Sequence, residues 1–207
     1  MVKAHEPAVL GWWADPVELR SRRSESGWEQ VRCNAVTRPY PDVGVALLFP
    51  FPRLQNGTEM DDTTAMRMAI TAADHVRSRT SPNPWVGAVL LDATGDVVAS
   101  GATEPPGGRH AEIVALDAAG AAASGATLVC TLEPCSHHGR TPPCTDAIIA
   151  AGVSRVVVGI VDPDDRVAGS GIEALRHAGI AVEVGVSAPE VAAQLAAYLH
   201  HRRTGRP

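Results

Sequence analysis

The sequence lacks an excess of basic residues and a long apolar segment, and both absences narrow what the chain can do. Its 18 Lys and Arg residues are outnumbered by 23 Asp and Glu residues, which gives a formal net charge of -5 at pH 7. A protein that binds nucleic acid through its surface charge needs the opposite balance. The longest apolar stretch near the start, residues 43–51, contains a proline and is too short to span a bilayer. We therefore expect neither a nucleic acid nor a membrane as a partner.

Cysteine is also scarce. The 207 residues include 4 cysteines, and three of them lie between Cys130 and Cys144. The first twenty residues contain Glu6, Asp15 and Glu18 and no long apolar run, so we identify no secretory signal. Disulfide frameworks belong mainly to secreted chains, whereas cytoplasmic thiols stay reduced. We therefore expect a cytoplasmic protein whose clustered cysteines bind a metal ion.

The character of the chain changes near Met60. A chain of 207 residues with 45% apolar residues can form one well-packed core and an appendage. Residues 1–59 hold most of the aromatic side chains but show no sustained helical or alternating pattern, and we expect an irregular N-terminal extension there. The regular pattern begins at residue 60. We expect one domain over residues 60–199 and a short tail over residues 200–207.

Strands and helices alternate within the expected domain. Asp61 or Asp62 can cap the first helix, Thr141 can cap a later one, and Ser187 and Glu190 form a capping box before the last. Helices are expected over residues 62–80, 111–122, 142–151, 169–178 and 188–199, and strands over residues 86–91, 97–100, 127–131, 156–161 and 180–184. This alternation favours an α/β fold, in which helices cover both faces of a sheet.

The most informative residues are His110 and Glu112, followed by Cys135 and Cys144. One imidazole and two thiolates can bind Zn2+ while a fourth position stays open to water, and a nearby carboxylate can move the protons of that water. Cys144 falls in the first turn of an expected helix, where the helix dipole favours the thiolate. We predict a hydrolytic zinc site with His110, Cys135 and Cys144 as metal ligands and Glu112 as the catalytic residue.

Other interpretations of these residues stay open. A lone His-x-Glu pair occurs by chance on many exposed helices, and a purely structural zinc site would need a fourth protein ligand. Cys130 or His137 could supply that ligand, although Cys130 lies in an apolar strand and is better explained as a small core residue. His137 and His138 are expected to shape the pocket, and we take His138 as a candidate substrate contact.

Longer motifs surround these residues. They are Ser81–Pro84 with Val86–Val89, His110–Glu112, Thr131–Cys144 and Val167–Ile172. Through them the chain from residue 60 onward resembles the deaminase half of the bifunctional riboflavin-biosynthesis deaminase/reductases, a branch of the cytidine-deaminase superfamily. Most superfamily members place two residues between the cysteines, whereas this branch places eight there, as this sequence does. The resemblance implies a three-layer α/β/α sandwich with a mixed central sheet.

The resemblance also implies a reaction. The substrate would be 2,5-diamino-6-(5-phosphoribosylamino)pyrimidin-4(3H)-one, which water converts to 5-amino-6-(5-phosphoribosylamino)uracil and ammonia. Glu112 would accept a proton from the attacking water, deliver it to a ring nitrogen and later protonate the departing amine.

Five residues are candidates for substrate contacts, one of them the His138 already named. Asn83 falls in the pocket-lining turn of the family and can hydrogen-bond a ring edge or ribose. Arg140, where the family carries Lys or Arg, is the candidate for the phosphate, although a solvated loop charge explains it equally well. Many relatives have histidine at the place of Thr103 and asparagine at the place of Asp164. An acidic side chain at position 164 would repel a phosphate if it faced the pocket.

The resemblance leaves the ends of the chain and its partners as expectations. Residues 200–207 resemble the segment that leads into the family's reductase domain, and we find no nicotinamide-binding motif, so a separately encoded reductase is a candidate partner. Met60 stands where relatives typically begin, and residues 1–59 are then an appended arm or a misplaced start. We expect a homo-oligomer. Two alternatives to the proposed activity are another nucleobase or nucleoside deaminase of the superfamily and a non-catalytic zinc-stabilised scaffold domain.

Overall fold

The computed structural model describes residues 60–206 apart from residues 139–141 and 165–166. The predictions for residues 1–59, for Arg140 and for Thr141 therefore lie outside the described residues.

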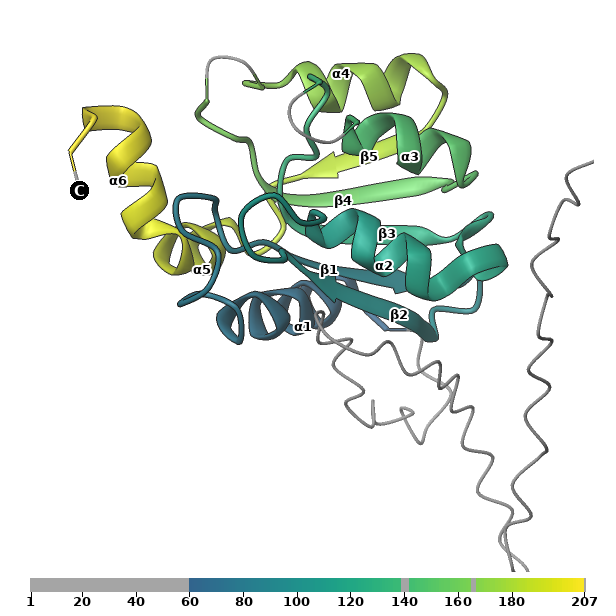
Figure 1. Ribbon diagram of the computed structural model, residues 1–207. Coiled ribbons are helices and arrows are strands. Elements are labelled where there is room, and N and C mark those ends of the chain that lie inside the picture. Colours follow the sequence, from purple (N-terminus) through teal and green to yellow (C-terminus); the bar gives the residue numbers. More distant parts are fainter. Residues whose placement is uncertain (1–59, 139–141, 165–166, 207) are drawn as a thin grey trace, which may run out of the picture. The chain divides into compact units, whose positions relative to one another are not determined.

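A five-stranded mixed sheet forms the centre of this domain (Figure 1). The strands are β1 (Gly87–Leu91), β2 (Val97–Ala102), β3 (Thr127–Leu132), β4 (Arg155–Ile160) and β5 (Ala181–Val184). Their order across the sheet is β2-β1-β3-β4-β5, with β1 antiparallel to both of its neighbours and β3, β4 and β5 parallel to one another. The carboxyl ends of β2, β3 and β4 consequently lie at the same edge of the sheet.

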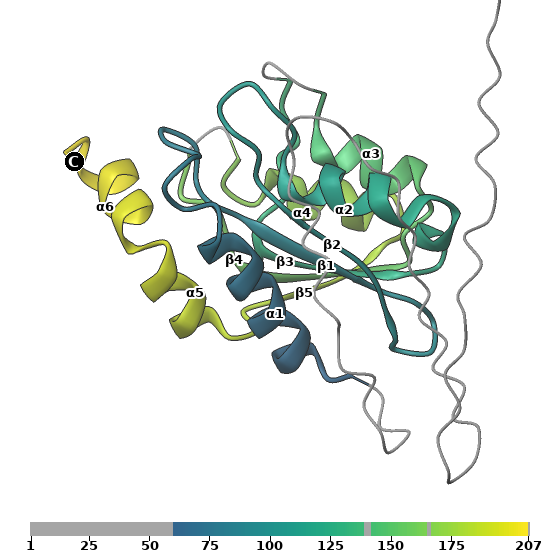
Figure 2. The same ribbon diagram turned by 60° about the horizontal axis from the view of Figure 1, so that its bottom comes forward.

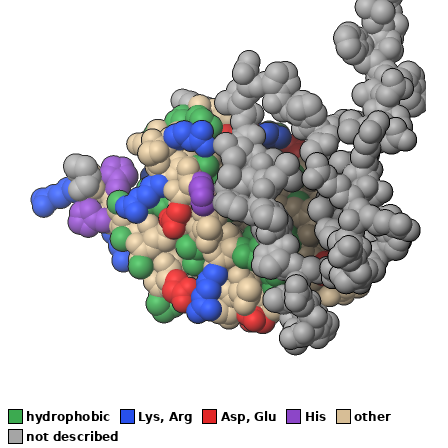
Figure 3. Space-filling model, turned by 90° about the horizontal axis from the view of Figure 1, so that it is seen from below, with side chains coloured by type: hydrophobic (Ala, Val, Ile, Leu, Met, Phe, Trp, Pro, Cys, Tyr) green, Lys and Arg blue, Asp and Glu red, His purple; other side chains and the backbone are tan. Residues whose placement is uncertain are grey.

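Helices cover both faces of the sheet, which confirms the predicted three-layer sandwich (Figures 1 and 2). One face carries α1 (Asp62–Asp74) and α5 (Ala188–Gln194), and the other carries α2 (Ala111–Ala119), α3 (Cys144–Ala150) and α4 (Ser170–His177). A 3-10 turn over Gly120–Ala123 follows α2, and α6 (Ala196–Thr204) extends from α5 beyond the sheet. Charged side chains of both signs are scattered over the face seen in Figure 3. None of the helices described here has the length and apolar character that a membrane crossing requires.

The central strands are buried on both sides, because helices pack on each face. Every residue of β1 is buried, and Leu90, Val129 and Val157 are completely inaccessible. Continuous apolar runs of this kind are typical of strands covered on both faces. Gly101 in β2 allows the start of α2 to approach closely, since an added Cβ would collide with the carbonyl oxygen of Ala111. This contact fixes the position of the helix that follows His110.

Several local predictions differ from the structure. Helix α3 begins at Cys144 with Pro143 as its N-cap, later than predicted. The prediction of a capping box before the last helix is wrong. Ser187 adopts a left-handed conformation with φ 51, and its side chain makes no capping hydrogen bond. Glu190 instead forms an exposed ion pair at 3.2 Å with Arg67 of α1. The expected single C-terminal helix is two helices, α5 and α6, and α6 runs through residues assigned to the tail.

Candidate active site

The four residues predicted to form the zinc site lie at one edge of the sheet, in the loops that follow β2 and β3 and in the first turns of α2 and α3. His110 is the N-cap residue of α2, and Glu112 lies in the first turn of that helix. Cys135 follows β3, and Cys144 is the first residue of α3. Because β2 and β3 end at the same edge, these loops meet although the residues are up to 34 positions apart.

The donor atoms of His110, Cys135 and Cys144 lie within 4.8 Å of one another, and they form the one group of potential metal ligands found among the described residues. The His110 Nδ1 atom is 3.3 Å from the Cys144 Sγ atom and 3.6 Å from the Cys135 Sγ atom. Tetrahedral zinc with ordinary bond lengths places nitrogen and sulfur ligands roughly 3.5 Å apart. The spacing and the chemistry of the donor set therefore fit a zinc ion.

Hydrogen bonds hold the two thiol-bearing segments together. The Cys144 backbone N–H donates to the Cys135 Sγ atom at 3.4 Å, and the Thr145 N–H donates to the Cys135 carbonyl oxygen at 3.2 Å. A hydrogen bond from the Cys144 thiol, supported by one from His110, lowers the pKa of Cys135 below its usual value. The same interaction with Cys135 raises the pKa of Cys144. Both hydrogen bonds favour the thiolate of Cys135, which is the form that binds metal.

Glu112 is buried beside this group, with 3% of its surface exposed. Burial raises the pKa of its carboxyl group to about 7 in the metal-free protein, while nearby His110 acts in the opposite direction. A carboxyl group of this kind can accept and return a proton near neutral pH.

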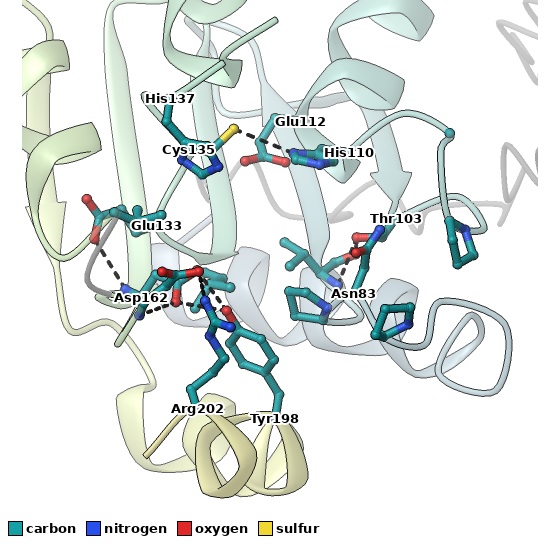
Figure 4. Close-up of a pocket in the computed structure, with 18 of the residues that line it drawn as sticks. Asn83, Thr103, His110, Glu112, Glu133, Cys135, His137, Asp162, Tyr198 and Arg202 are labelled. Atoms are coloured by element: carbon teal, nitrogen blue, oxygen red, sulfur yellow. Dashed lines mark hydrogen bonds and ion pairs between the residues drawn. The ribbon is translucent and has the colours of Figure 1, made fainter. Parts of the chain in front are cut away.

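His110, Glu112 and Cys135 line a pocket of about 420 Å³. Its walls include the turn before β1, the loop after β2, the segments after β3 and β4, and helix α6 (Figure 4). The loop after β2 is closed on itself, because the Glu104 N–H donates to the Arg109 carbonyl oxygen at 2.9 Å and the Arg109 N–H donates to the Glu104 carboxylate at 2.8 Å. This volume is adequate for a small polar metabolite.

Three predicted substrate contacts line the pocket. Asn83 lies on one wall and is partly exposed. Thr103 lies beside it, but its hydroxyl already accepts the Val86 N–H at 3.1 Å. Asp164 also lines the pocket, where it forms an ion pair with Arg202 of α6.

The two loop histidines and Cys130 are placed differently. His138 is exposed and is absent from the pocket lining, whereas His137 lines the pocket and its buried Nδ1 atom has no hydrogen-bond partner among the described residues. Cys130 is fully buried in β3, and its thiol donates to the Val157 carbonyl oxygen at 3.6 Å. Cys130 lies outside the group of potential metal ligands, in agreement with its interpretation as a core residue.

Sequence reasoning missed other pocket residues. Buried Glu133 accepts the backbone N–H groups of Gly169 and Gly171 at 2.9 Å each, and so ties the end of β3 to the start of α4. Asp162 accepts the Tyr198 hydroxyl at 2.9 Å. A carboxylate at the end of an apolar strand is a signal that could have identified Glu133, because a buried charge needs partners.

Comparison with known proteins defines the class of this domain. Residues 59–160 match the family model of the cytidine and deoxycytidylate deaminase zinc-binding region. The mixed sheet and the His/Cys/Cys group agree with this match. The domain belongs to the cytidine-deaminase-like proteins with a zinc-binding site.

Within that class the chain is similar to the deaminase part of the riboflavin biosynthesis protein RibD. It is 49% identical to RibD of Mycobacterium tuberculosis (strain ATCC 25618 / H37Rv) over 144 residues, which are 69% of this chain and 42% of that protein. RibD of Escherichia coli (strain K12) is 47% identical over 148 residues, which are 72% of this chain and 40% of that protein. The chain therefore spans about two fifths of the length of these relatives.

A solved structure shows the same likeness. The crystal structure of a diaminohydroxyphosphoribosylaminopyrimidine deaminase/5-amino-6-(5-phosphoribosylamino)uracil reductase from Thermotoga maritima matches with a TM-score of 0.67 and 42% identity, over 70% of this chain and 42% of that chain.

Proposed function

We propose that this chain catalyses the hydrolytic deamination of 2,5-diamino-6-(5-phosphoribosylamino)pyrimidin-4(3H)-one to 5-amino-6-(5-phosphoribosylamino)uracil and ammonia, a step of riboflavin biosynthesis. The observation that carries this proposal is the group of His110, Cys135 and Cys144 beside buried Glu112, in which His110, Cys135 and Glu112 line one pocket. The similarity to RibD over this domain supports the substrate class.

In this proposal His110, Cys135 and Cys144 hold the zinc ion. When bound, zinc lowers the pKa of water and so provides a nucleophile near neutral pH. Glu112 accepts a proton from the attacking water and delivers it to the adjacent ring nitrogen as the new C–O bond forms. Glu112 then takes the remaining hydroxyl proton and passes it to the exocyclic amine, the C–N bond breaks, and ammonia leaves.

The other pocket residues orient the substrate. Asn83 can pair with a ring edge or ribose, since its amide both donates and accepts hydrogen bonds. Thr103 mainly shapes the wall of the pocket, because its hydroxyl already accepts a hydrogen bond from the Val86 backbone N–H. His137 is better placed than His138 to contact the substrate. Arg140 remains the residue that we predict to bind the phosphate group of the substrate.

The proposal extends to the whole chain. Residues 60–199 form the deaminase domain with α6 completing the pocket, in a homo-oligomer located in the cytoplasm, where the thiols stay reduced. A reductase would act on the product, because the Thermotoga maritima relative named deaminase/reductase joins the two activities in one chain.

The test is ammonia release by the purified, zinc-loaded full chain supplied with the phosphorylated diaminopyrimidine, with cytidine and guanine in parallel reactions. Rapid release from the first compound alone supports the proposal. Preference for cytidine or guanine would assign the chain to another deaminase activity of the class. Stoichiometric zinc without turnover of any compound would favour the scaffold hypothesis.

A further inference from the structure

One acidic side chain closes the loop between β2 and α2. The Glu104 carboxylate accepts the backbone N–H of Arg109 at 2.8 Å and the Nε–H of its guanidinium group at 3.1 Å. In return, the Glu104 backbone N–H donates to the Arg109 carbonyl oxygen at 2.9 Å. Glu104 thus binds both the backbone and the side chain of the residue that directly precedes His110, the expected metal ligand.

The Glu104 side chain is packed beneath one wall of the pocket. Residues 106–108 of the loop line the pocket, and 14% of the Glu104 side chain is exposed. A Cβ atom added at Gly108 would lie 2.7 Å from the Glu104 Cβ atom and 3.0 Å from its Oε2 atom. Figure 4 shows Thr103 and His110 at the two ends of this loop. The carboxylate is therefore held close to the backbone that leads to His110.

The orientation of the His110 ring depends on that backbone. A metal-bound histidine usually donates its second ring N–H to a carboxylate or a carbonyl group, which fixes the ring. Within the described part of the chain, the hydrogen-bond contacts of the ring are those of its Nδ1 atom with the sulfur atoms of Cys135 and Cys144. The close packing of α2 on β2 fixes the backbone after His110. The hydrogen bonds of Glu104 fix the backbone before it.

We propose that Glu104 is a positioning residue, which holds His110 in the orientation that zinc binding requires. This inference rests on the metal site of the proposed function. Hydrogen bonds to an ionised group are stronger than neutral ones, and the Glu104 carboxylate makes them to a residue five positions away. Arg109 also pairs at 2.9 Å with Asp117 of α2, but the Asp117 side chain is 56% exposed. Such an outer ion pair contributes little.

Three variants of the full chain test the inference. Glu104→Ala removes the carboxylate, whereas Glu104→Gln keeps an oxygen that can accept the Arg109 backbone N–H but has no negative charge. Asp117→Asn is the matched control, because it removes the other acidic partner of Arg109 and leaves the loop contacts in place.

Two measurements report on the metal site and a third reports on folding. Zinc affinity would be measured by competition with a chelator. The visible absorption of the Co2+-substituted protein would be recorded as well, since it depends on the geometry of the metal ligands. Urea denaturation of the zinc-free proteins would give their stabilities separately.

The expected pattern separates a positioning role from a role in folding alone. Glu104→Ala should weaken zinc binding by roughly 10-fold to 100-fold, which is the usual effect of removing a group that orients a metal ligand, and should shift the Co2+ absorption. Glu104→Gln should bind zinc with an affinity between those of Glu104→Ala and the wild type. Asp117→Asn should stay within about threefold of the wild type.

Two results would overturn the inference. One is a lower stability of both Glu104 variants in urea with unchanged zinc affinity and Co2+ absorption, because a role in folding alone would produce it. The other is a loss of zinc affinity in Asp117→Asn as large as that in the Glu104 variants. If Glu104→Ala does not fold, the comparison of Glu104→Gln with Asp117→Asn decides between these outcomes.

The metal measurements also separate this inference from the proposed activity. A wild-type chain that binds zinc but releases no ammonia from the phosphorylated diaminopyrimidine would contradict the proposed function. The zinc affinities of the variants would still support or overturn the role of Glu104. A wild-type chain that binds no zinc would overturn both.

Discussion

At the residue scale, Glu112 is the group whose chemistry can be separated most clearly from metal binding. Glu112→Gln preserves the shape of the side chain but removes its ability to carry a proton. We expect kcat to fall by roughly 100-fold to 10,000-fold, which is the usual contribution of a general acid–base group. Zinc content, measured by atomic absorption, should match that of the wild type. Ammonia release above a tenth of the wild-type rate would refute the role assigned to Glu112.

The cysteines provide a comparison between residues of the same type. Cys135→Ser should lose stoichiometric zinc, because a serine hydroxyl stays protonated where the thiol has a lowered pKa. Cys130→Ala is the matched control, since Cys130 is buried in β3 away from the metal-ligand group. Metal analysis after dialysis should show zinc in Cys130→Ala and little in Cys135→Ser. Retention of zinc by both variants would exclude Cys135 as a ligand.

Residues close to a motif were predictable from the sequence, and residues brought in by packing were not. His110 and Cys144 could be identified because each stands at a strand-to-helix or loop-to-helix junction with a recognisable spacing. The contact of Arg202 with Asp164 could not be anticipated, because it depends on α6 packing against a loop that lies far earlier in the chain. Asp164 was identified as a departure from the family pattern, but only the structure pairs it with Arg202.

At the scale of elements, the contact between α4 and the segment that carries Cys135 leaves no space for a larger residue. A Cβ at Gly171 would collide with the Pro134 carbonyl oxygen. Helix propensity alone would favour alanine over glycine by about 0.5–1 kcal/mol. Any loss of stability in Gly171→Ala therefore measures the steric effect. We expect Gly171→Ala to reduce the free energy of unfolding by about 1–3 kcal/mol and to lower activity. Glu173→Ala, at an exposed position of α4, should change it by less than about 0.5 kcal/mol in urea denaturation. Equal stabilities of the two variants would show that α4 can shift at no cost.

The order and type of the elements were predictable because they depend on local periodicity. The hairpin of β1 and β2 and the buried parallel strands β3 and β4 follow the predicted segments closely. Helix ends were harder to predict, since they depend on backbone geometry. The pattern at Ser187 and Glu190 has the composition of a capping box, but the left-handed backbone of Ser187 directs its side chain away from that role. Glu190 contacts α1 instead, 123 positions earlier in the chain.

At the scale of the whole molecule, the zinc group joins loops that follow β2 and β3 to the starts of α2 and α3, so metal binding should contribute to global stability. Without metal, the buried Cys144 thiol and its neighbours lose the ion that would bind them together. A ligand present at about 1,000 times its Kd adds about 4 kcal/mol, and for a domain of this size each kcal/mol corresponds to about 2–4 °C in Tm. Removal of zinc by a chelator should therefore lower Tm by about 10 °C in calorimetry. The Cys135→Ser variant should show no further decrease with the chelator, whereas Glu112→Gln should respond as the wild type does. Metal analysis would confirm that the treated wild-type protein is free of zinc. If its Tm were nevertheless unchanged, packing alone would hold these loops together.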